Sequence, residues 1–305
     1  MPRAVKAHIL LVLITFAWGA TFVLIKSALA QVSPLVFNTL RMVIATAALA
    51  IIFHRALPEL DRESVKGGII VGIFLWLGYA FQTTGLRLTT PSKSAFITGL
   101  AVVLVPLIVA ATGKRVPNRW TVLGVFAAFM GLYLMTIPAG EGLSLASINR
   151  GDLLTFGCAI SFACHIFTTG IMTRRYGFRR ISIVQVVTAA VLMALIIPAE
   201  SPRLILTPTA ITAILFTGLV CTAAAFSIQS WAQQFTPPTH TALIFALEPV
   251  FAGLTSYIVS RENLGFRGTI GAILILGGIL ISELRGSSVE PDRNFEENSP
   301  SKRLE

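Results

Sequence analysis

The stretch Pro34–Phe53, PLVFNTLRMVIATAALAIIF, decides the class of fold. Its twenty residues contain one charge, Arg41, and about twenty helical residues are needed to cross the ~30 Å hydrocarbon core of a bilayer. A transmembrane β-strand needs only about ten residues of alternating polarity, so a continuous apolar run of this length favours a helix. The stretch therefore predicts a transmembrane helix.

Similar apolar runs recur along the whole chain, and together they predict an all-α integral membrane protein with ten transmembrane helices. The other nine predicted spans are Ile9–Ile25, Gly67–Leu86, Ser94–Ala111, Thr121–Ile137, Leu153–Met172, Ile181–Ile197, Ala210–Trp231, Ala242–Val259 and Gly268–Ile281.

The composition agrees with a membrane protein and excludes several other classes. Of 305 residues, 54% are hydrophobic and 12% are charged, whereas about a quarter of the residues of a soluble domain are charged. Three cysteines, all inside apolar runs, argue against a disulfide scaffold. The net charge of +10 comes mostly from short loops between apolar runs, which indicates membrane orientation rather than a nucleic-acid partner.

The distribution of Lys and Arg predicts which side of the membrane each loop faces. With a cytoplasmic N-terminus, sixteen of the 24 basic residues lie in inside segments and seven in outside segments. Basic residues are enriched in cytoplasmic loops. We therefore expect a multi-pass protein of the bacterial inner membrane with both termini in the cytoplasm.

The second half of the chain repeats the first at an offset of 147 residues. The matching pairs are Thr89/Thr236, Pro91/Pro238, Ala95/Ala242, Ile97/Ile244, Leu100/Leu247, Val103/Val250, Gly124/Gly271 and Gly131/Gly278. A duplicated unit of five spans must insert in the opposite orientation, and inverted repeats in transporters enclose a central site near the middle of the membrane. We expect two five-helix repeats, residues 1–140 and 151–285, around a central cavity, and a disordered tail, residues 286–305.

Within each repeat the two matched glycines are seven residues apart, on one helix face. This spacing predicts close packing between helices, with a homodimer contact as the alternative.

Several motifs resemble those of the drug/metabolite transporter superfamily, in its EamA-like branch. They are Phe16-Ala17-Trp18-Gly19-Ala20-Thr21-Phe22, Arg41, the stretch from Thr90 to Pro106, Gln229-Ser230-Trp231-Ala232-Gln233-Gln234, and Ala242 to Phe251 with its Glu248-Pro249 pair. Arg261 stands where that family usually has a glycine. The resemblance covers residues 7–285 and implies a ten-helix carrier of small metabolites, often an exporter.

Two charged residues inside predicted spans are the strongest site candidates, because a charge in the hydrocarbon core costs roughly 2.5–3.5 kcal/mol unless it is paired or faces water. Arg41 shares a helix face with Asn38, and the pair could bind a carboxylate or phosphate. Alternatively, Arg41 is held by backbone carbonyls or by Glu248. Because Pro249 follows it and cannot donate to the carbonyl of Phe245, Glu248 should lie at a kink. A proton, a cation or an amine would suit it. The alternatives are a structural ion pair and a carboxyl group kept neutral by desolvation.

Other polar and aromatic residues complete the predicted substrate site: Trp18, Phe22, Tyr79, Gln82, His165 and Gln229. For each of them singly, helix packing or anchoring at the lipid interface is the alternative. Trp18 and Phe22 share one helix face, and Tyr79 and Gln82 share another. His165 is either a packing residue or part of proton coupling.

The sequence carries no phosphate-binding loop and no zinc-protease or serine-hydrolase motif. We therefore predict no cofactor, no metal and no enzymatic activity. The expected function is secondary transport, most simply export, of small amphipathic metabolites such as amino acids by alternating access. A passive facilitator of the same fold and a membrane enzyme acting on lipid-linked intermediates are the alternatives.

Overall fold

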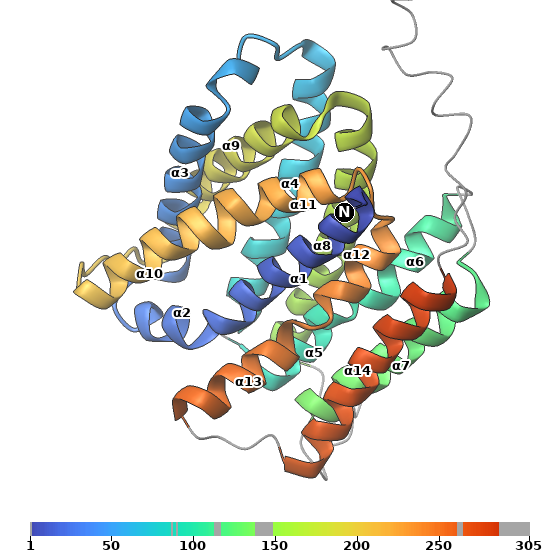
Figure 1. Cartoon of the computed structure of the whole chain (residues 1–305). Coiled ribbons are helices and arrows are strands. Elements are labelled where there is room, and N and C mark those ends of the chain that lie inside the picture. Colours follow the sequence, from blue (N-terminus) through green and yellow to red (C-terminus); the bar gives the residue numbers. More distant parts are fainter. Residues whose placement is uncertain are drawn as a thin grey trace, which may run out of the picture.

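A computed structural model describes residues 2–86, 88–89, 91–112, 117–137, 149–260 and 265–286, and these residues form a bundle of helices (Figure 1). The helices are α1 Arg3–Ala20, α2 Phe22–Leu29, α3 Pro34–Ile52, η1 His54–Ala56, α4 Arg62–Leu86, α5 Pro91–Gly99, α6 Ala101–Ala111, α7 Arg119–Thr136, α8 Arg150–Tyr176, α9 Phe178–Ile196, η3 Ile197–Ala199, α10 Pro208–Gly218, η4 Leu219–Ala224, α11 Ala225–Ala232, α12 Pro238–Phe245, α13 Glu248–Ser260 and α14 Gly265–Gly286.

Helices occupy all ten of the predicted apolar ranges, which confirms an all-α membrane protein. By length and composition, seven helical segments of the described chain are sufficient to cross a bilayer, and two shorter apolar helices lie at Phe96–Ala111 and Arg119–Met135. The predicted tail lies outside the described residues, except for Gly286, which ends α14.

Four of the ten predicted ranges differ from the continuous helices that we expected. The first breaks at Thr21, the fourth at Leu100 and the ninth at Ala246–Leu247, while the eighth contains the π-helical turn η4. The break before Glu248-Pro249 agrees with the expected kink, because proline lacks the N–H that would continue the helix. The breaks in the fourth and ninth ranges fall at matching positions under the offset of 147 residues.

The helix contacts show that the two halves are related by an approximate two-fold axis. Helix α4 packs on α8 and α9, and the corresponding helices of the other half repeat this arrangement, with α11 on α1 and α10 on α3. Helices α5 and α6 pack on α8, just as α12 and α13 pack on α1. Each contact therefore has a counterpart in which the halves exchange places, as a two-fold arrangement requires.

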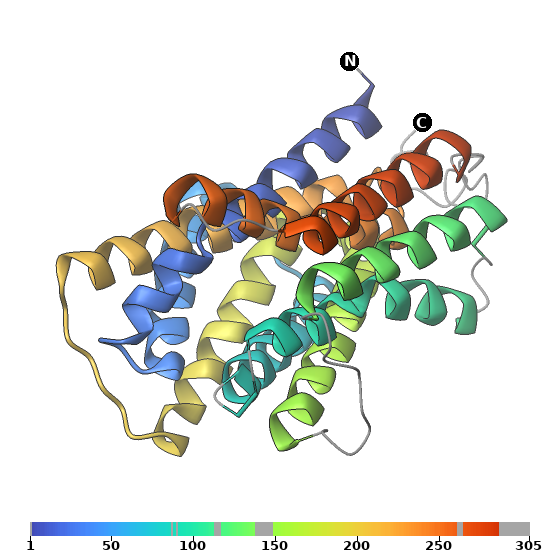
Figure 2. The same ribbon diagram turned by 90° about the horizontal axis from the view of Figure 1, so that it is seen from below.

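The pair α7 and α14 shows that the halves run in opposite directions (Figures 1 and 2). A Cβ on Gly124 would come within 2.4 Å of the carbonyl oxygen of Gly278, and a Cβ on Gly131 within 2.5 Å of that of Gly271. The first glycine of each helix thus faces the second glycine of the other, so the helices are antiparallel. The glycines pack between helices of the same chain, as predicted from their spacing. The helix face that carries them is therefore not open to a second copy of the protein.

We predict that Gly278→Ala destabilises the protein by about 1–3 kcal/mol, because the new methyl group overlaps the α7 backbone. Gly277→Ala is the matched control, since nothing lies within 4 Å of its Cβ position and alanine is the better helix former. Thermal unfolding of the purified variants in detergent measures both. Equal melting temperatures for the two variants would contradict the close packing.

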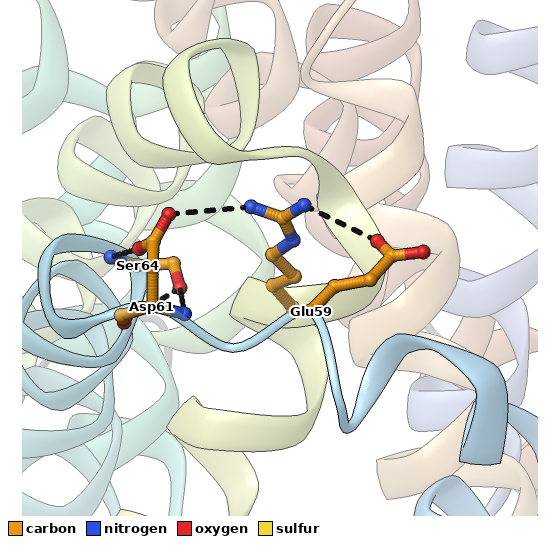
Figure 3. A network of polar contacts seen from close by, with 4 residues as sticks. Glu59, Asp61 and Ser64 are labelled. Carbon is orange, nitrogen blue, oxygen red and sulfur yellow. Dashed lines mark hydrogen bonds and ion pairs between the residues drawn. The ribbon is translucent and has the colours of Figure 1, made fainter.

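Polar contacts join the two halves at both ends of the α3–α9 pair. At one end, the Arg180 guanidinium forms ion pairs with Glu59 at 3.2 Å and Asp61 at 3.5 Å (Figure 3). At the other end, a Glu200 carboxylate oxygen accepts from the backbone N–H of Leu35 at 2.7 Å, and an Arg203 guanidinium N–H donates to the Ala30 carbonyl at 2.6 Å. The α3–α9 pair is therefore fixed at both ends.

Asp61 is held in its charged form at this junction. The Ser64 N–H donates to a carboxylate oxygen of Asp61 at 2.7 Å. This bond, the Ser64 side chain and the Arg180 charge lower the pKa of Asp61 below its ordinary value. A carboxyl group whose pKa is lower in the folded than in the unfolded state stabilises the fold above about pH 4, and its contribution is lost as the pH falls through the folded pKa.

We therefore expect Asp61→Asn to lower the melting temperature at pH 7, and we expect its difference from the wild type to shrink below about pH 4. Melting curves from pH 7 to pH 3 test this. A difference that stays constant over that range would show that the Asp61 charge contributes nothing.

Candidate functional site

Arg41 lies inside the bundle at the centre of a polar cluster. Its side chain is only 4% exposed. Its Nε donates to the Thr222 hydroxyl at 3.0 Å and its Nη2 to the Tyr79 hydroxyl at 3.2 Å, while the guanidinium carbon lies 4.8 Å from the centroid of the Tyr79 ring. Arg41 thus joins α3 to α4 and η4 through side chains, and its Nη1 makes no hydrogen bond to a described residue.

The π-helical turn η4 supplies the groups that meet Arg41 and Trp18. The Thr222 hydroxyl donates to the carbonyl of Thr217, five residues earlier, at 2.9 Å, and the Trp18 indole N–H donates to the carbonyl of Cys221 at 2.9 Å. Such π-helical turns are rare and are frequently found at functional sites. Here the widened turn presents one hydroxyl and one carbonyl to side chains from the other half.

A row of aromatic rings runs beside these polar groups. Ring centroids are 5.9 Å apart for Trp18 and Phe226, 6.4 Å for Phe226 and Tyr79, and 5.5 Å for Tyr79 and Phe162. Phe245 contacts Trp18 on the other side, at 5.0 Å. Trp18 and Tyr79 are half-buried, so the row provides apolar surface next to hydrogen-bonding groups, as small-molecule sites do.

Glu248 stands at the start of the half-helix α13, where the N-terminal end of a helix favours a negative charge. Its main chain touches α1, because a Cβ on Gly19 would come within 2.7 Å of the carbonyl oxygen of Glu248. A glycine next to Trp18 is therefore needed for α1 to approach the break between α12 and α13. The Glu248 side chain is half-buried and makes no hydrogen bond or ion pair with a described residue.

Arg41 and Glu248 lie around the same groups. Both are close enough to Tyr79 and Cys221 to interact with them electrostatically. Arg41 is held by hydroxyl groups, and neither a backbone carbonyl nor Glu248 is among its described hydrogen-bond partners. The arrangement places a guanidinium group and a carboxyl group near one aromatic surface.

Asn38 and His165 lie in hydrogen-bonded links between helices. The Asn38 amide donates to the Thr83 hydroxyl at 2.9 Å. At the matching positions of the other half, the Gln185 amide donates to the Ser230 hydroxyl at 3.0 Å, and the Gln185 carbonyl oxygen lies 2.8 Å from Nε2 of His165. His165 is 2% exposed, so its ring is enclosed by protein.

The remaining predicted residues are more dispersed. The Gln229 amide donates to Gln233 at 3.0 Å, and its carbonyl oxygen is buried without a partner among the described residues. Gln82, which matches Gln229 under the offset, is half-buried on α4. Phe22 begins α2, and its side chain lies outside the described part of the structure.

The internal repeat separates shared features from those that only one half has. The Asn38–Thr83 bond has a counterpart in Gln185–Ser230, which indicates a structural role. Under the offset of 147, however, Thr188 matches Arg41, Phe226 matches Tyr79 and Ala101 matches Glu248. Each of the charged and phenolic groups of the cluster therefore lacks a counterpart in the other half.

Our sequence-based set omitted five residues that contact the cluster. They are Phe162, Cys221, Thr222, Phe226 and Phe245. The repeat could have revealed Phe226, because it matches Tyr79 at the offset of 147. Nothing in the sequence predicts that the Cys221 carbonyl accepts a hydrogen bond, because that depends on the π-helical turn.

Comparison with known proteins gives matches along nearly the whole chain. The model of the EamA-like transporter family matches twice, at residues 5–137 and 149–284. A protein of Archaeoglobus fulgidus named uncharacterized transporter is 34% identical over 283 residues, which cover 93% of this chain and 87% of that protein.

More distant similarities cover the chain to the same extent. A probable amino-acid metabolite efflux pump of Escherichia coli is 24% identical, covering 91% of this chain and 94% of the pump. A protein of known crystal structure superposes with a TM-score of 0.75 at 18% identity, covering 94% of this chain and 99% of that one. At this identity the superposition shows a shared fold.

We predict that the His165–Gln185 contact is energetically coupled. In a double-mutant cycle with His165→Phe and Gln185→Met, the double variant should be more stable than the sum of the single effects implies, by about 0.5–2 kcal/mol. Thermal unfolding of the four proteins measures the coupling. Strict additivity would show that the hydrogen bond does not stabilise the fold and would leave His165 available for another role.

Proposed function

The chain belongs to the EamA-like transporter family, and on this premise we propose that it is a secondary transporter that exports small amphipathic metabolites, amino acids or similar compounds, across the inner membrane. The distribution of basic residues supports a cytoplasmic location for both termini. The family and the names of its relatives point to a transporter rather than an enzyme.

The observation that carries this proposal is the placement of Arg41 and Glu248. Both lie where the halves meet, around Tyr79 and Cys221, without a described bond to each other. A guanidinium group binds a carboxylate well, and a carboxylate binds an ammonium group. A zwitterion such as an amino acid would bind its carboxylate at Arg41 and its amine near Glu248. The aromatic row from Trp18 to Phe162 would contact the apolar part.

The broken helices support alternating access around this site. In many secondary transporters, discontinuous helices from two inverted repeats form the substrate site, and the repeats rock around it. Here α5 and α6 in one half and α12 and α13 in the other break at matching positions, and Glu248 starts the second segment of one of them. Because α3 and α9 are joined at both ends, we place the pivot along this pair and the moving elements around the breaks.

The relative from Escherichia coli supports amino-acid metabolites as the first substrates to test. A thermal-stability screen of the purified protein with amino acids, nucleosides, sugars and organic cations would identify a ligand, because binding to the native state raises the melting temperature. Transport of that ligand is then measured in proteoliposomes.

We predict that Arg41→Lys and Glu248→Gln each reduce initial transport rates by about tenfold or more, as expected for the loss of a charge-assisted contact worth about 1.4 kcal/mol or more. Glu248→Gln should also flatten the pH dependence of transport. Thr188→Ala, at the counterpart of Arg41, and the surface variant Glu63→Gln are controls that should retain wild-type rates.

Unchanged rates and pH dependence in both site variants would overturn the assignment of these residues. Transport that occurs but does not respond to an imposed proton gradient would favour a passive facilitator. Product formation in detergent, without a second compartment, would favour an enzyme.

A further inference from the structure

A basic cleft lies away from the central site, where α3 ends beside the start of α9. It has a volume of about 320 Å³, which lies in the range of small-molecule sites. The residues that line it are Ile52, Phe53, His54, Arg55, Ala56 and Arg179. Nothing in the proposed transport cycle uses these residues.

Two aromatic rings hold the helix ends together at this cleft. Phe53, which follows α3, and Phe178, the first residue of α9, meet edge to face with centroids 5.8 Å apart. The Arg179 guanidinium carbon lies 5.8 Å from the centroid of the Phe178 ring. The helices α3 and α9 also pack along their lengths. The cleft is therefore built on a fixed part of the fold.

The acidic residues near the cleft are engaged by other basic residues. Arg180 points about 100° around the helix from Arg179, and it forms ion pairs with both Glu59 and Asp61 (Figure 3). Glu63, the remaining acid of this segment, pairs with Lys66 at 2.7 Å. Neither Arg55 nor Arg179 forms an ion pair with a described residue, so the cleft has a net positive charge.

The start of α9 adds further hydrogen-bond donors for an anion. Its N-cap is Gly177, which has no side chain to accept from the first backbone N–H groups. The free N–H groups and the helix dipole favour a negative charge at that end. They add to the two guanidinium groups, which are the main source of positive charge.

Apolar side chains adjoin the basic cleft on the side of α3. Ile51 and Ile52 are 74% and 63% exposed, at the end of a helix long and apolar enough to cross a bilayer. A ligand that contacts both the basic cleft and the exposed isoleucines would have an anionic head and an apolar tail. Basic pockets at helix ends near the membrane surface bind anionic lipid headgroups in this way.

We propose that the basic cleft binds the phosphodiester headgroup of an anionic phospholipid. The phosphate accepts from Arg55 and Arg179, and the acyl chains lie along Ile51 and Ile52. Free organic phosphates share the headgroup chemistry, but they lack the apolar part that the exposed isoleucines would contact.

The test is native mass spectrometry of the purified full chain, titrated with phosphatidylglycerol, phosphatidylcholine or glycerol 3-phosphate. We expect phosphatidylglycerol to bind at least tenfold more tightly than the other two. Arg55→Ala combined with Arg179→Ala should weaken phosphatidylglycerol binding at least fivefold. The matched control combines Arg62→Ala with Arg175→Ala, which removes the same charge from exposed residues outside the cleft and should change binding less than twofold.

The other outcomes overturn the proposal. Equal losses in the cleft variant and the control would show general attraction to a basic surface, and no loss in either would show that the cleft is not a site. Glycerol 3-phosphate binding as tightly as the lipid would identify a site for free phosphates. Arg55→Gln with Arg179→Gln, which keeps polar side chains of similar length, serves if the alanine variant does not fold.

Discussion

The structure depends on the absence of water in the interior of the bilayer. Backbone groups there must be satisfied within the chain, which leaves helices as the form of each apolar segment. The same constraint makes each buried charge expensive. Arg41 meets it with hydroxyl acceptors from two other elements. The cost of burying Glu248 is less fully compensated. Its position at the start of α13 supplies the favourable field of the helix end, but it has no hydrogen-bond partner among the described residues. Among the described residues, Arg41 is therefore more fully hydrogen-bonded than Glu248.

Comparing the two halves of the duplication helps to distinguish contacts that maintain the architecture from contacts that occur only once. Features found in both halves maintain the architecture: the glycine contacts between α7 and α14, the Asn38–Thr83 and Gln185–Ser230 bonds, and the matched helix breaks. Features found in one half break the two-fold relation, and they gather around Arg41, Tyr79 and Glu248. An asymmetric substrate needs an asymmetric site, because two identical surfaces cannot distinguish its charged ends. Under the proposed function, the features common to both halves form the framework, and the residues without a counterpart contact the substrate.

Close approach and irregular backbone serve the same site. Gly19 brings α1 against the break that precedes Glu248, and the π-helical turn η4 brings Thr222 and Cys221 to Arg41 and Trp18. Irregular backbone at membrane depth is tolerated where protein surrounds it. The joined ends of α3 and α9, by contrast, provide a rigid element on which the basic cleft is built. Arg41 thus lies on the fixed helix α3, whereas Glu248 lies next to a helix break.

The amino-acid sequence by itself determined the membrane class, the ten apolar ranges, the inverted repeat and the intramembrane charges, because hydrophobicity, length and an offset of 147 residues can be read along one dimension. The kink at Glu248 could also be predicted, since it follows from the chemistry of proline. Only the tertiary structure decided that Asn38 binds Thr83 rather than assisting Arg41, that His165 binds Gln185, and that Phe162, Thr222 and Phe226 join the cluster. These partners lie on different helices and far apart in the chain, with a separation of 181 residues between Arg41 and Thr222. Their contacts depend on helix rotation and on a π-helical turn that no local pattern specifies.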